Sequence, residues 1–170
     1  CLTQANLGCR NAAALDLNAA CSGFVYSLAT AGNFIRAGNC EKALVIGSET
    51  MSMVVDPRDK KTFPLFGDAA GAVLLEAAPK PNDEKASGLL TYRLASVGEM
   101  SECLVVPAGG SRMPLSQEVL DSRSQYLRMD GRSVFKWAVR LVPDITREML
   151  ASVGLGLGDV DWFIFHQANK

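Results

Sequence analysis

Hydrophobic and polar positions in the first third of the chain predict a strand, a helix and a second strand. Residues 12–17 form a short apolar run, and residues 22–37 carry apolar side chains at helical spacing with Gly38 as a C-terminal stop. Residues 42–49 are a second apolar run, of the kind found in buried strands. This order predicts a βαβ unit with a parallel strand pair and a right-handed crossover.

The pattern continues with a long loop, two strands and a polar connection. Residues 51–68 are irregular and carry two prolines and a basic cluster, and loops of this length are usually functional or mobile. Residues 69–77 and 89–97 predict strands. Between them, residues 78–88 are rich in Pro, Lys, Asp and Glu and predict a connection between two units.

The remaining sequence predicts an irregular segment at residues 109–125, called the excursion below, then a long helix and a final strand. Residues 109–125 are polar and poorly periodic, whereas residues 131–154 repeat apolar side chains on one face of a helix. Pro143 lies inside this helix and predicts a kink or a break. Residues 158–166 predict a turn and a strand that ends on His166.

Composition and charge narrow the class of protein. The 170 residues are 48% hydrophobic and 21% charged, as in ordinary soluble globular proteins. A formal net charge of −1 provides no basic field for nucleic acid. No stretch approaches the roughly 18 apolar residues of a membrane span, and the start lacks a signal-peptide pattern. We expect neither nucleic-acid binding nor a membrane span.

Cysteine usage indicates a reducing compartment. The five cysteines are odd in number, are irregularly spaced and form no C-x-x-C pair, and His166 is the only histidine. This pattern argues against a disulfide framework and against a zinc site, so we expect a cytoplasmic protein without a metal. The chain begins without methionine and ends directly after an apolar run, so we expect a piece of a longer protein.

Cys21 and His166 are the candidates for chemistry. Cys21 lies where the first strand turns into a helix; it is either a small buried hydrophobe or a nucleophile whose thiolate the helix N-terminus stabilises. His166 follows the last strand and is either a half-buried structural histidine or the acid–base partner of the cysteine. Ligands of open α/β sheets bind at the carboxyl ends of strands, which favours the functional interpretation.

Three further segments have a structural and a functional interpretation. Residues 66–75, FGDAAGAVLL, allow close backbone approach but lack the spacing of a phosphate loop. The DPRDKK loop, residues 56–61, is either a solvated charge run or a seat for a phosphorylated ligand. Arg132, Lys136 and Arg140 share one helix face, which is either its solvated side or a docking surface for an acidic partner.

Five segments in order resemble the β-ketoacyl-acyl-carrier-protein synthase III group of the thiolase superfamily. They are spread over nearly the whole chain, which makes the set far more specific than any one of them. The segments are LDLNAACSGFVYSL, ALVIGSE, FGDAAGAVLL, MDGRSVFKWAV and DWFIFHQAN.

The resemblance implies an α/β thiolase-like fold with layers in the order α-β-α-β-α, assembled as a homodimer. This chain would hold an incomplete part of it. Residues 1–77 would be the remainder of the N-terminal half with the nucleophilic cysteine, and residues 78–88 the connection. Residues 89–170 would be the first part of the C-terminal half with the catalytic histidine.

The resemblance also implies the reaction and the residues that perform it. An acyl group passes from acyl-CoA to Cys21, and a decarboxylative Claisen condensation with malonyl-ACP follows, as in the initiation of fatty-acid biosynthesis. His166, in HQAN, would stabilise the carbanion and the oxyanion, with the backbone N–H of Cys21 as a second donor. Phe66 matches an aromatic that lines the acyl pocket. No cofactor beyond these substrates is implied.

The resemblance assigns binding roles to basic residues. Arg132 and Lys136 match the positive surface that the family offers to the acyl carrier protein. Lys60 matches an arginine that stacks on the adenine of CoA, and lysine is not equivalent to arginine at a stacking site. Either Arg58 substitutes for that arginine or the primer donor is not CoA.

Departures from the family pattern leave alternatives open. The family's catalytic asparagine would lie beyond Lys170, because Asn169 belongs to HQAN, so we expect this chain alone, with its site incomplete, to have little or no condensing activity. Lys60 and the long excursion also fit a polyketide or secondary-metabolite synthase, or an enzyme similar to hydroxymethylglutaryl-CoA synthase. The missing asparagine also fits a non-catalytic binding chain with the thiolase fold.

Overall fold

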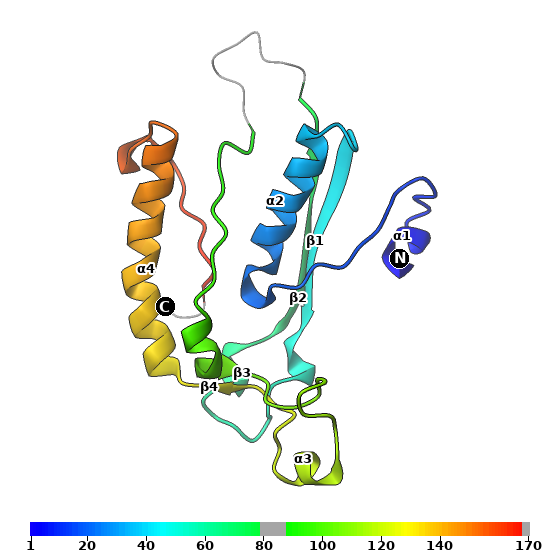
Figure 1. Ribbon diagram of the computed structural model, residues 1–170, viewed down its shortest axis with the longest axis vertical. Coiled ribbons are helices and arrows are strands. Elements are labelled where there is room, and N and C mark those ends of the chain that lie inside the picture. The colour runs from blue at the N-terminus through cyan, green and yellow to red at the C-terminus, as the bar shows by residue number, and fades with distance from the viewer. Residues whose placement is uncertain (79–87, 168–170) are drawn as a thin grey trace. The chain divides into compact units, whose positions relative to one another are not determined.

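The computed structural model describes residues 1–78 and 88–167 (Figure 1). The chain divides into two compact units. The first unit comprises Cys1–Gly47 and Ala72–Lys80, and the second comprises Ser48–Gly71 and Pro81–Lys170. Residues 79–87, which make up most of the predicted connection, lie outside the described residues. The division of the chain into two halves at this connection therefore stays a prediction.

The N-terminal elements are two helices and a pair of strands. Helix α1 spans Leu2–Asn6 and helix α2 spans Gly23–Arg36; strand β1 spans Lys42–Thr50 and strand β2 spans Asp68–Glu76. The predictions of the first long helix and of these two strands are confirmed. A 3₁₀ turn at Ala20–Ser22 leads directly into α2.

Strands β1 and β2 form a two-stranded sheet. Lys42, which begins β1, forms an ion pair of 2.8 Å with Glu76, which ends β2. At the other end of the sheet the backbone N–H of Ser52 donates to Asp68, the first residue of β2, over 2.7 Å. The start of β1 therefore lies beside the end of β2, and the end of β1 beside the start of β2, so the two strands run antiparallel.

Helix α2 covers one face of β1, and the other face remains exposed. Val45 is buried, whereas Leu44 and Ile46, which point the other way, are exposed. A Cβ built on Gly47 would lie 3.2 Å from Cδ2 of Phe24, so strand and helix approach closely at this glycine. The sequence predicted a buried strand, but the described residues cover only one of its faces.

The second unit contains a long helix entered from a short sheet. Strand β3, Leu104–Val105, pairs antiparallel with strand β4, Arg128–Met129. Helix α3 spans Gln117–Asp121 in the excursion between them, and helix α4 spans Gly131–Ser152. The backbone N–H of Asp130 donates to the Cys103 carbonyl over 2.8 Å, which ties the start of α4 to the sheet.

Helix α4 runs through Pro143 without a break, so of the two predicted outcomes, a kink or a break, the break is wrong. The φ angle of proline suits a helix, and its cost is the lost hydrogen bond to the preceding turn. Asp130 caps the helix: its Oδ1 accepts the Ser133 N–H over 3.2 Å, and its Oδ2 accepts the Ser133 hydroxyl over 2.6 Å.

Glycines end both long helices as the sequence predicts. Gly38 after α2 has φ +75°, and Gly154 after α4 has φ +74°. Gly154 N–H donates to Ala151 over 3.1 Å, and Leu155 N–H donates to Leu150 over 3.0 Å, the pair of bonds that defines a Schellman motif. The left-handed backbone at these positions explains why glycine occupies them.

Three predicted strands are wrong within the described residues. Residues 12–17, 89–97 and 158–166 are assigned to no strand, and the last contains only a 3₁₀ turn at Leu157–Asp159. A strand requires a hydrogen-bonded ladder with a second strand, and these segments form none in the part of the chain described. The predicted parallel βαβ pair is wrong for the same reason.

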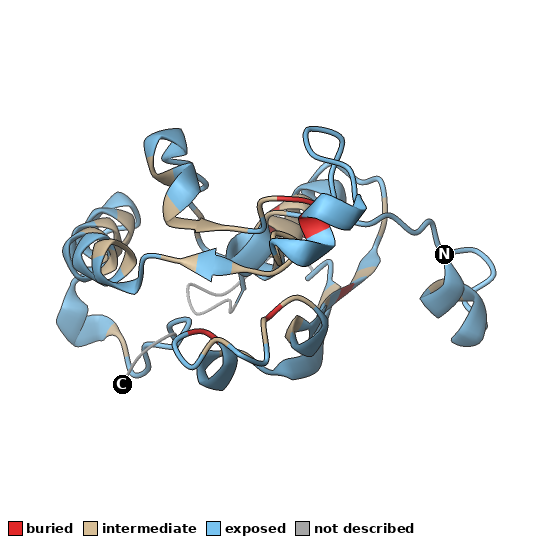
Figure 2. Ribbon diagram, turned by 90° about the horizontal axis from the view of Figure 1, so that it is seen from below, coloured by how far each residue is buried: buried red, intermediate tan, exposed pale blue. Residues whose placement is uncertain are grey.

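The described residues bury little apolar surface (Figure 2). Helix α4 contains no fully buried residue. The buried apolar side chains of the described residues are all small or medium in size: Ala29, Ala31, Val45, Val55, Ala108 and Val119. Over residues 1–78 and 88–167, no helix has the length and apolar character needed to cross a membrane.

Candidate active site

Cys21 lies in a strained turn at the start of α2. Ala20, the residue before it, has φ +48°, a left-handed backbone that is costly for alanine. The Asn18 side-chain oxygen accepts the Ala20 N–H over 3.0 Å, and Ser22 N–H donates to the Ala19 carbonyl over 3.1 Å. Strain of this kind is held in place where a turn must present a particular side chain.

The Cys21 residue is exposed in the first unit, as are Cys1 and Cys9. Cys40 and Cys103 are half-buried, and all five cysteines are free. The interpretation of Cys21 as a buried small hydrophobe is therefore wrong for the chain described. An exposed thiol at the start of a 14-residue helix is suited to react with a ligand.

His166 lies in the second unit, in an irregular and exposed segment. The rings of Phe163 and Phe165, just before it, stack with centroids 5.9 Å apart. Because Cys21 and His166 belong to different units, their pairing in one site stays a prediction. Asn169 lies outside the described residues.

The DPRDKK loop is hydrogen-bonded to a distant segment of the chain, and its basic side chains are exposed to solvent. Arg58 and Lys60 are exposed, whereas Val55 and Thr62, on either side of them, are each only 1% exposed. The backbone N–H of Leu127 donates to the Val54 carbonyl over 2.8 Å and joins the loop to the C-terminal end of the excursion. Exposed cations on a fixed loop suit the binding of an anion.

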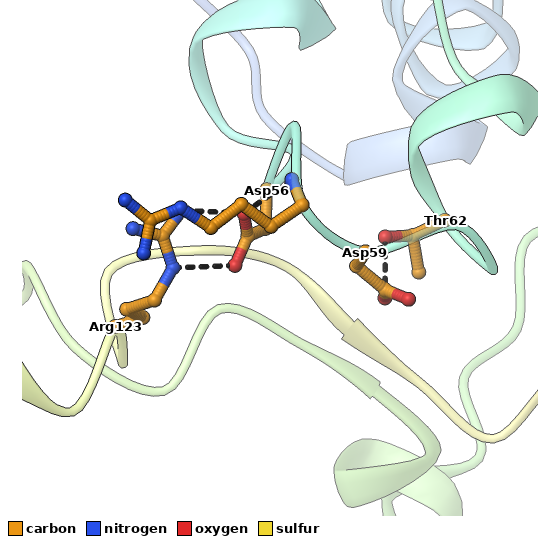
Figure 3. A network of polar contacts seen from close by, with 5 residues as sticks. Asp56, Asp59, Thr62 and Arg123 are labelled. Carbon is orange, nitrogen blue, oxygen red and sulfur yellow. Dashed lines mark hydrogen bonds and ion pairs between the residues drawn. The ribbon is translucent and has the colours of Figure 1, made fainter.

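An ion pair between Asp56 and Arg123 crosses from this loop to the excursion (Figure 3). Arg123 donates to both carboxylate oxygens, through Nε to Oδ2 over 2.7 Å and through Nη2 to Oδ1. These hydrogen bonds lower the pKa of Asp56 to about 2 and raise the pKa of Arg123 above its usual range. The Arg58 N–H donates to the same carboxylate over 2.8 Å.

A second carboxylate, Asp59, fixes the following turn. Its Oδ1 accepts the Lys61 N–H over 2.9 Å. Its Oδ2 accepts the Thr62 hydroxyl over 2.7 Å (Figure 3). These hydrogen bonds, led by that from Lys61, hold the pKa of Asp59 below its usual range. Asp56 and Asp59 therefore hold the loop through hydrogen bonds, while Lys60 and Lys61 stay exposed.

The FGDAAGAVLL segment holds Phe66 half-buried at the entrance to β2. Asp68 accepts both the N–H and the hydroxyl of Ser52, the latter over 2.6 Å, and these bonds lower its pKa. The close backbone approach expected at its glycines is not found in the described part of the chain. A Cβ on Gly67 or Gly71 would meet nothing within 4 Å.

Arg132 and Lys136 lie exposed on α4. Lys136 and Arg140 border a shallow hollow of about 430 Å³ beside the α4 helix and residue Met100. Trp137 and Leu141 supply apolar lining to the same hollow. Within the described ranges no three His, Cys, Asp or Glu side chains gather as metal ligands.

The turn at Ala20 and the Asp56–Arg123 pair were not predicted from the sequence. Alanine is an unfavourable residue for a left-handed backbone, so no residue type marked the turn. Arg123 lies 67 residues from Asp56 in a segment without periodicity. The Asn18 side chain was the only local signal, because asparagine often caps its own turn.

Comparisons with known proteins show which family the chain is similar to. The sequence profile of the family 3-Oxoacyl-[acyl-carrier-protein (ACP)] synthase III matches residues 15–98. The chain is 44% identical to the β-ketoacyl-[acyl-carrier-protein] synthase III of Rhodopirellula baltica, covering 100% of this chain and 53% of that protein.

Solved structures show the same relationship in three dimensions. A 3-oxoacyl-(acyl-carrier-protein) synthase III matches with a TM-score of 0.89 and 30% identity, covering 100% of this chain and 52% of the other. The priming β-ketosynthase of the R1128 polyketide biosynthetic pathway matches with a TM-score of 0.75 and 31% identity, covering 92% and 44%. The chain spans about half the length of the curated relatives it matches. It is a homologue of the β-ketoacyl-acyl-carrier-protein synthase III family and has the mixed α/β, thiolase-like fold of that family over this part of its length.

Proposed function

We propose that the chain supplies the nucleophile of a β-ketoacyl-acyl-carrier-protein synthase III-type condensing enzyme. The observation that carries the proposal is the exposed Cys21 on a strained turn at the start of α2. In such an enzyme the cysteine sulfur attacks the thioester carbonyl of an acyl-CoA, the bond from the carbonyl carbon to the CoA sulfur breaks, and CoA leaves with the proton. The acyl group then rests on Cys21.

The second half of the reaction condenses this acyl group with malonyl-ACP. Loss of CO₂ leaves a carbanion, which attacks the acyl carbonyl while the bond to Cys21 breaks, and the departing thiolate takes a proton from solvent to restore the thiol. We propose His166 as the donor that stabilises the developing negative charge, with the Cys21 N–H as the second donor for the oxyanion. Phe66 would line the acyl site as an aromatic wall.

The substrates and the assembly are part of the same proposal. Arg58 and Lys60, exposed on the tethered loop, would contact the phosphates or the adenine of CoA. Arg132 and Lys136, exposed on α4, would face the acidic carrier protein. We further propose that the enzyme is a cytoplasmic homodimer and that it initiates fatty-acid synthesis.

A polyketide priming role is the second candidate. Its support is the structural likeness to a priming β-ketosynthase of a polyketide pathway. Primer preference separates the two candidates. Preference for short acyl-CoA with malonyl-ACP supports the fatty-acid role and contradicts the polyketide role.

Acyl labelling followed by intact-mass measurement tests the proposal. The purified protein, incubated with acetyl-CoA or a longer acyl-CoA, should gain the mass of one acyl group, and Cys21→Ala should abolish the gain. Cys9→Ala is the matched control, because Cys9 is also an exposed free thiol and should leave the labelling unchanged. Labelling that survives Cys21→Ala would refute Cys21 as the nucleophile.

A further inference from the structure

The loop that bears Arg58 and Lys60 is held by a group outside it. Val55 and Thr62 are buried, and the stretch between them carries exposed cations. The Asp56 carboxylate binds two partners at once, the Arg123 guanidinium and the Arg58 N–H. Any movement of Arg123 is therefore transmitted directly to the backbone at Arg58.

Arg123 is itself fixed in place. Its guanidinium lies 4.7 Å from the centre of the Tyr126 ring, a cation–π contact, and its side chain is 29% exposed. Its backbone has φ +55°, which persists in a residue other than glycine only where surrounding contacts hold it. One such contact is the hydrogen bond from the Arg123 N–H to the Leu120 carbonyl, over 3.1 Å.

The ion pair also changes the electrostatic field of the loop at residues 54–62. The loop contains two carboxylates, Asp56 and Asp59, which would repel an anionic ligand. Asp59 is already satisfied by hydrogen bonds inside the loop. Arg123 neutralises Asp56, so the exposed cations of the loop dominate the local field.

We propose that Arg123 is a positioning residue: its ion pair with Asp56 holds residues 54–62 in the conformation that presents Arg58 and Lys60 to the phosphate groups of CoA. The inference rests on the proposed function, since that function names CoA as the ligand. It assigns a role to the excursion, which none of the family motifs explains.

Calorimetric titration of CoA into the full chain tests this role. Arg123→Met removes the charge and keeps much of the side-chain volume, and it should weaken CoA binding by about ten-fold. Arg123→Lys, which keeps the charge but not the two-pronged geometry, should fall between that variant and wild type. Arg112→Met is the matched control: Arg112 lies in the same excursion with a 90% exposed side chain, and its loss should leave the affinity unchanged.

Acylation kinetics separate positioning from a purely structural role. In Arg123→Met the acyl-CoA concentration for half-maximal labelling of Cys21 should rise about ten-fold, while the maximal rate changes less than about two-fold. Trypsin should also cut faster after Arg58, Lys60 and Lys61 in Arg123→Met and in Asp56→Asn than in Arg112→Met. If Arg123→Met fails to fold, Arg123→Lys decides by the same criteria.

The two proposals fail in different ways. A wild-type protein that binds CoA, with an Arg123→Met variant that binds it equally well, overturns the positioning role alone. A lowered maximal rate with unchanged half-saturation also overturns it. A wild-type protein that does not bind CoA overturns the proposed ligand and this inference together.

Discussion

Gly47 controls how closely β1 approaches α2, the helix that follows Cys21, and its replacement gives a sharp test of the packing. An alanine Cβ would lie 3.2 Å from Cδ2 and 3.8 Å from Cβ and Cγ of Phe24. Carbon atoms normally rest about 3.5–4.0 Å apart, so either the ring or the helix must move. Phe24 follows Cys21 by three residues, so a shift of the helix start also moves the thiol.

The loss of unfolding free energy in Gly47→Ala can be estimated by comparison with the same substitution at a second strand glycine. Overpacking costs about 1–3 kcal/mol, and the partly exposed Phe24 ring places Gly47→Ala near 1.5 kcal/mol. Gly71 in β2 has open space where its Cβ would lie, so Gly71→Ala carries no such cost. Both substitutions restrict the unfolded chain equally, by about 0.4–1 kcal/mol, and the difference between them isolates the contact.

Thermal and urea unfolding measure the difference. Gly47→Ala should melt roughly 3–6 °C below Gly71→Ala, the shift that about 1.5 kcal/mol produces in a domain of this size. Labelling of Cys21 by acyl-CoA should slow in Gly47→Ala and not in Gly71→Ala. Equal melting temperatures in the two variants would refute the close packing of α2 on β1.

Two further predictions concern acid stability and a helix end. The pKa of Asp56 is lowered to about 2 from an unfolded value near 3.9, so its contribution to stability is complete above about pH 4 and is lost as the pH falls towards 2. Urea midpoints measured from pH 5 to pH 2 should therefore fall less steeply in Asp56→Asn than in wild type, and identical slopes would contradict the ion pair. Gly154→Ala should lower the free energy of unfolding by about 1 kcal/mol, because alanine is strained at φ +74°. Gly158→Ala, also in open space but without a positive φ, is its control, and an equal effect of both substitutions would show that the helix end is not the cause.

The helices were predictable because their signals are local. Apolar spacing and a terminal glycine fix Gly23–Arg36 and Gly131–Ser152 within a few residues of their predicted bounds. The strands at Lys42–Thr50 and Asp68–Glu76 were predicted as well, because their apolar runs lie close in sequence and pair with each other. Only the break, one of the two outcomes predicted at Pro143, was wrong, because the φ of proline is compatible with a helix even though proline lacks the N–H for one of its hydrogen bonds.

The predictions that failed concern pairing between distant segments. An apolar run such as residues 12–17 indicates that a strand can form, but the ladder depends on a second strand elsewhere. The candidate thiol was found from its place between a strand-like run and a helix, although its turn at Ala20 has no sequence marker. The Asp56–Arg123 pair depends on three-dimensional proximity alone.

The sequence separations of two contacts described above indicate an order of folding. Phe24 and Gly47 are close neighbours along the chain, so α2 can settle on β1 after a short loop closes. The Asp56–Arg123 pair joins residues 67 positions apart. The conformational entropy lost on closing this loop is offset only once much of the second unit is in place. Helix α2 is thus positioned early in folding, whereas the loop at residues 54–62 is fixed late, and loss of Arg123 should accelerate unfolding more than it slows folding.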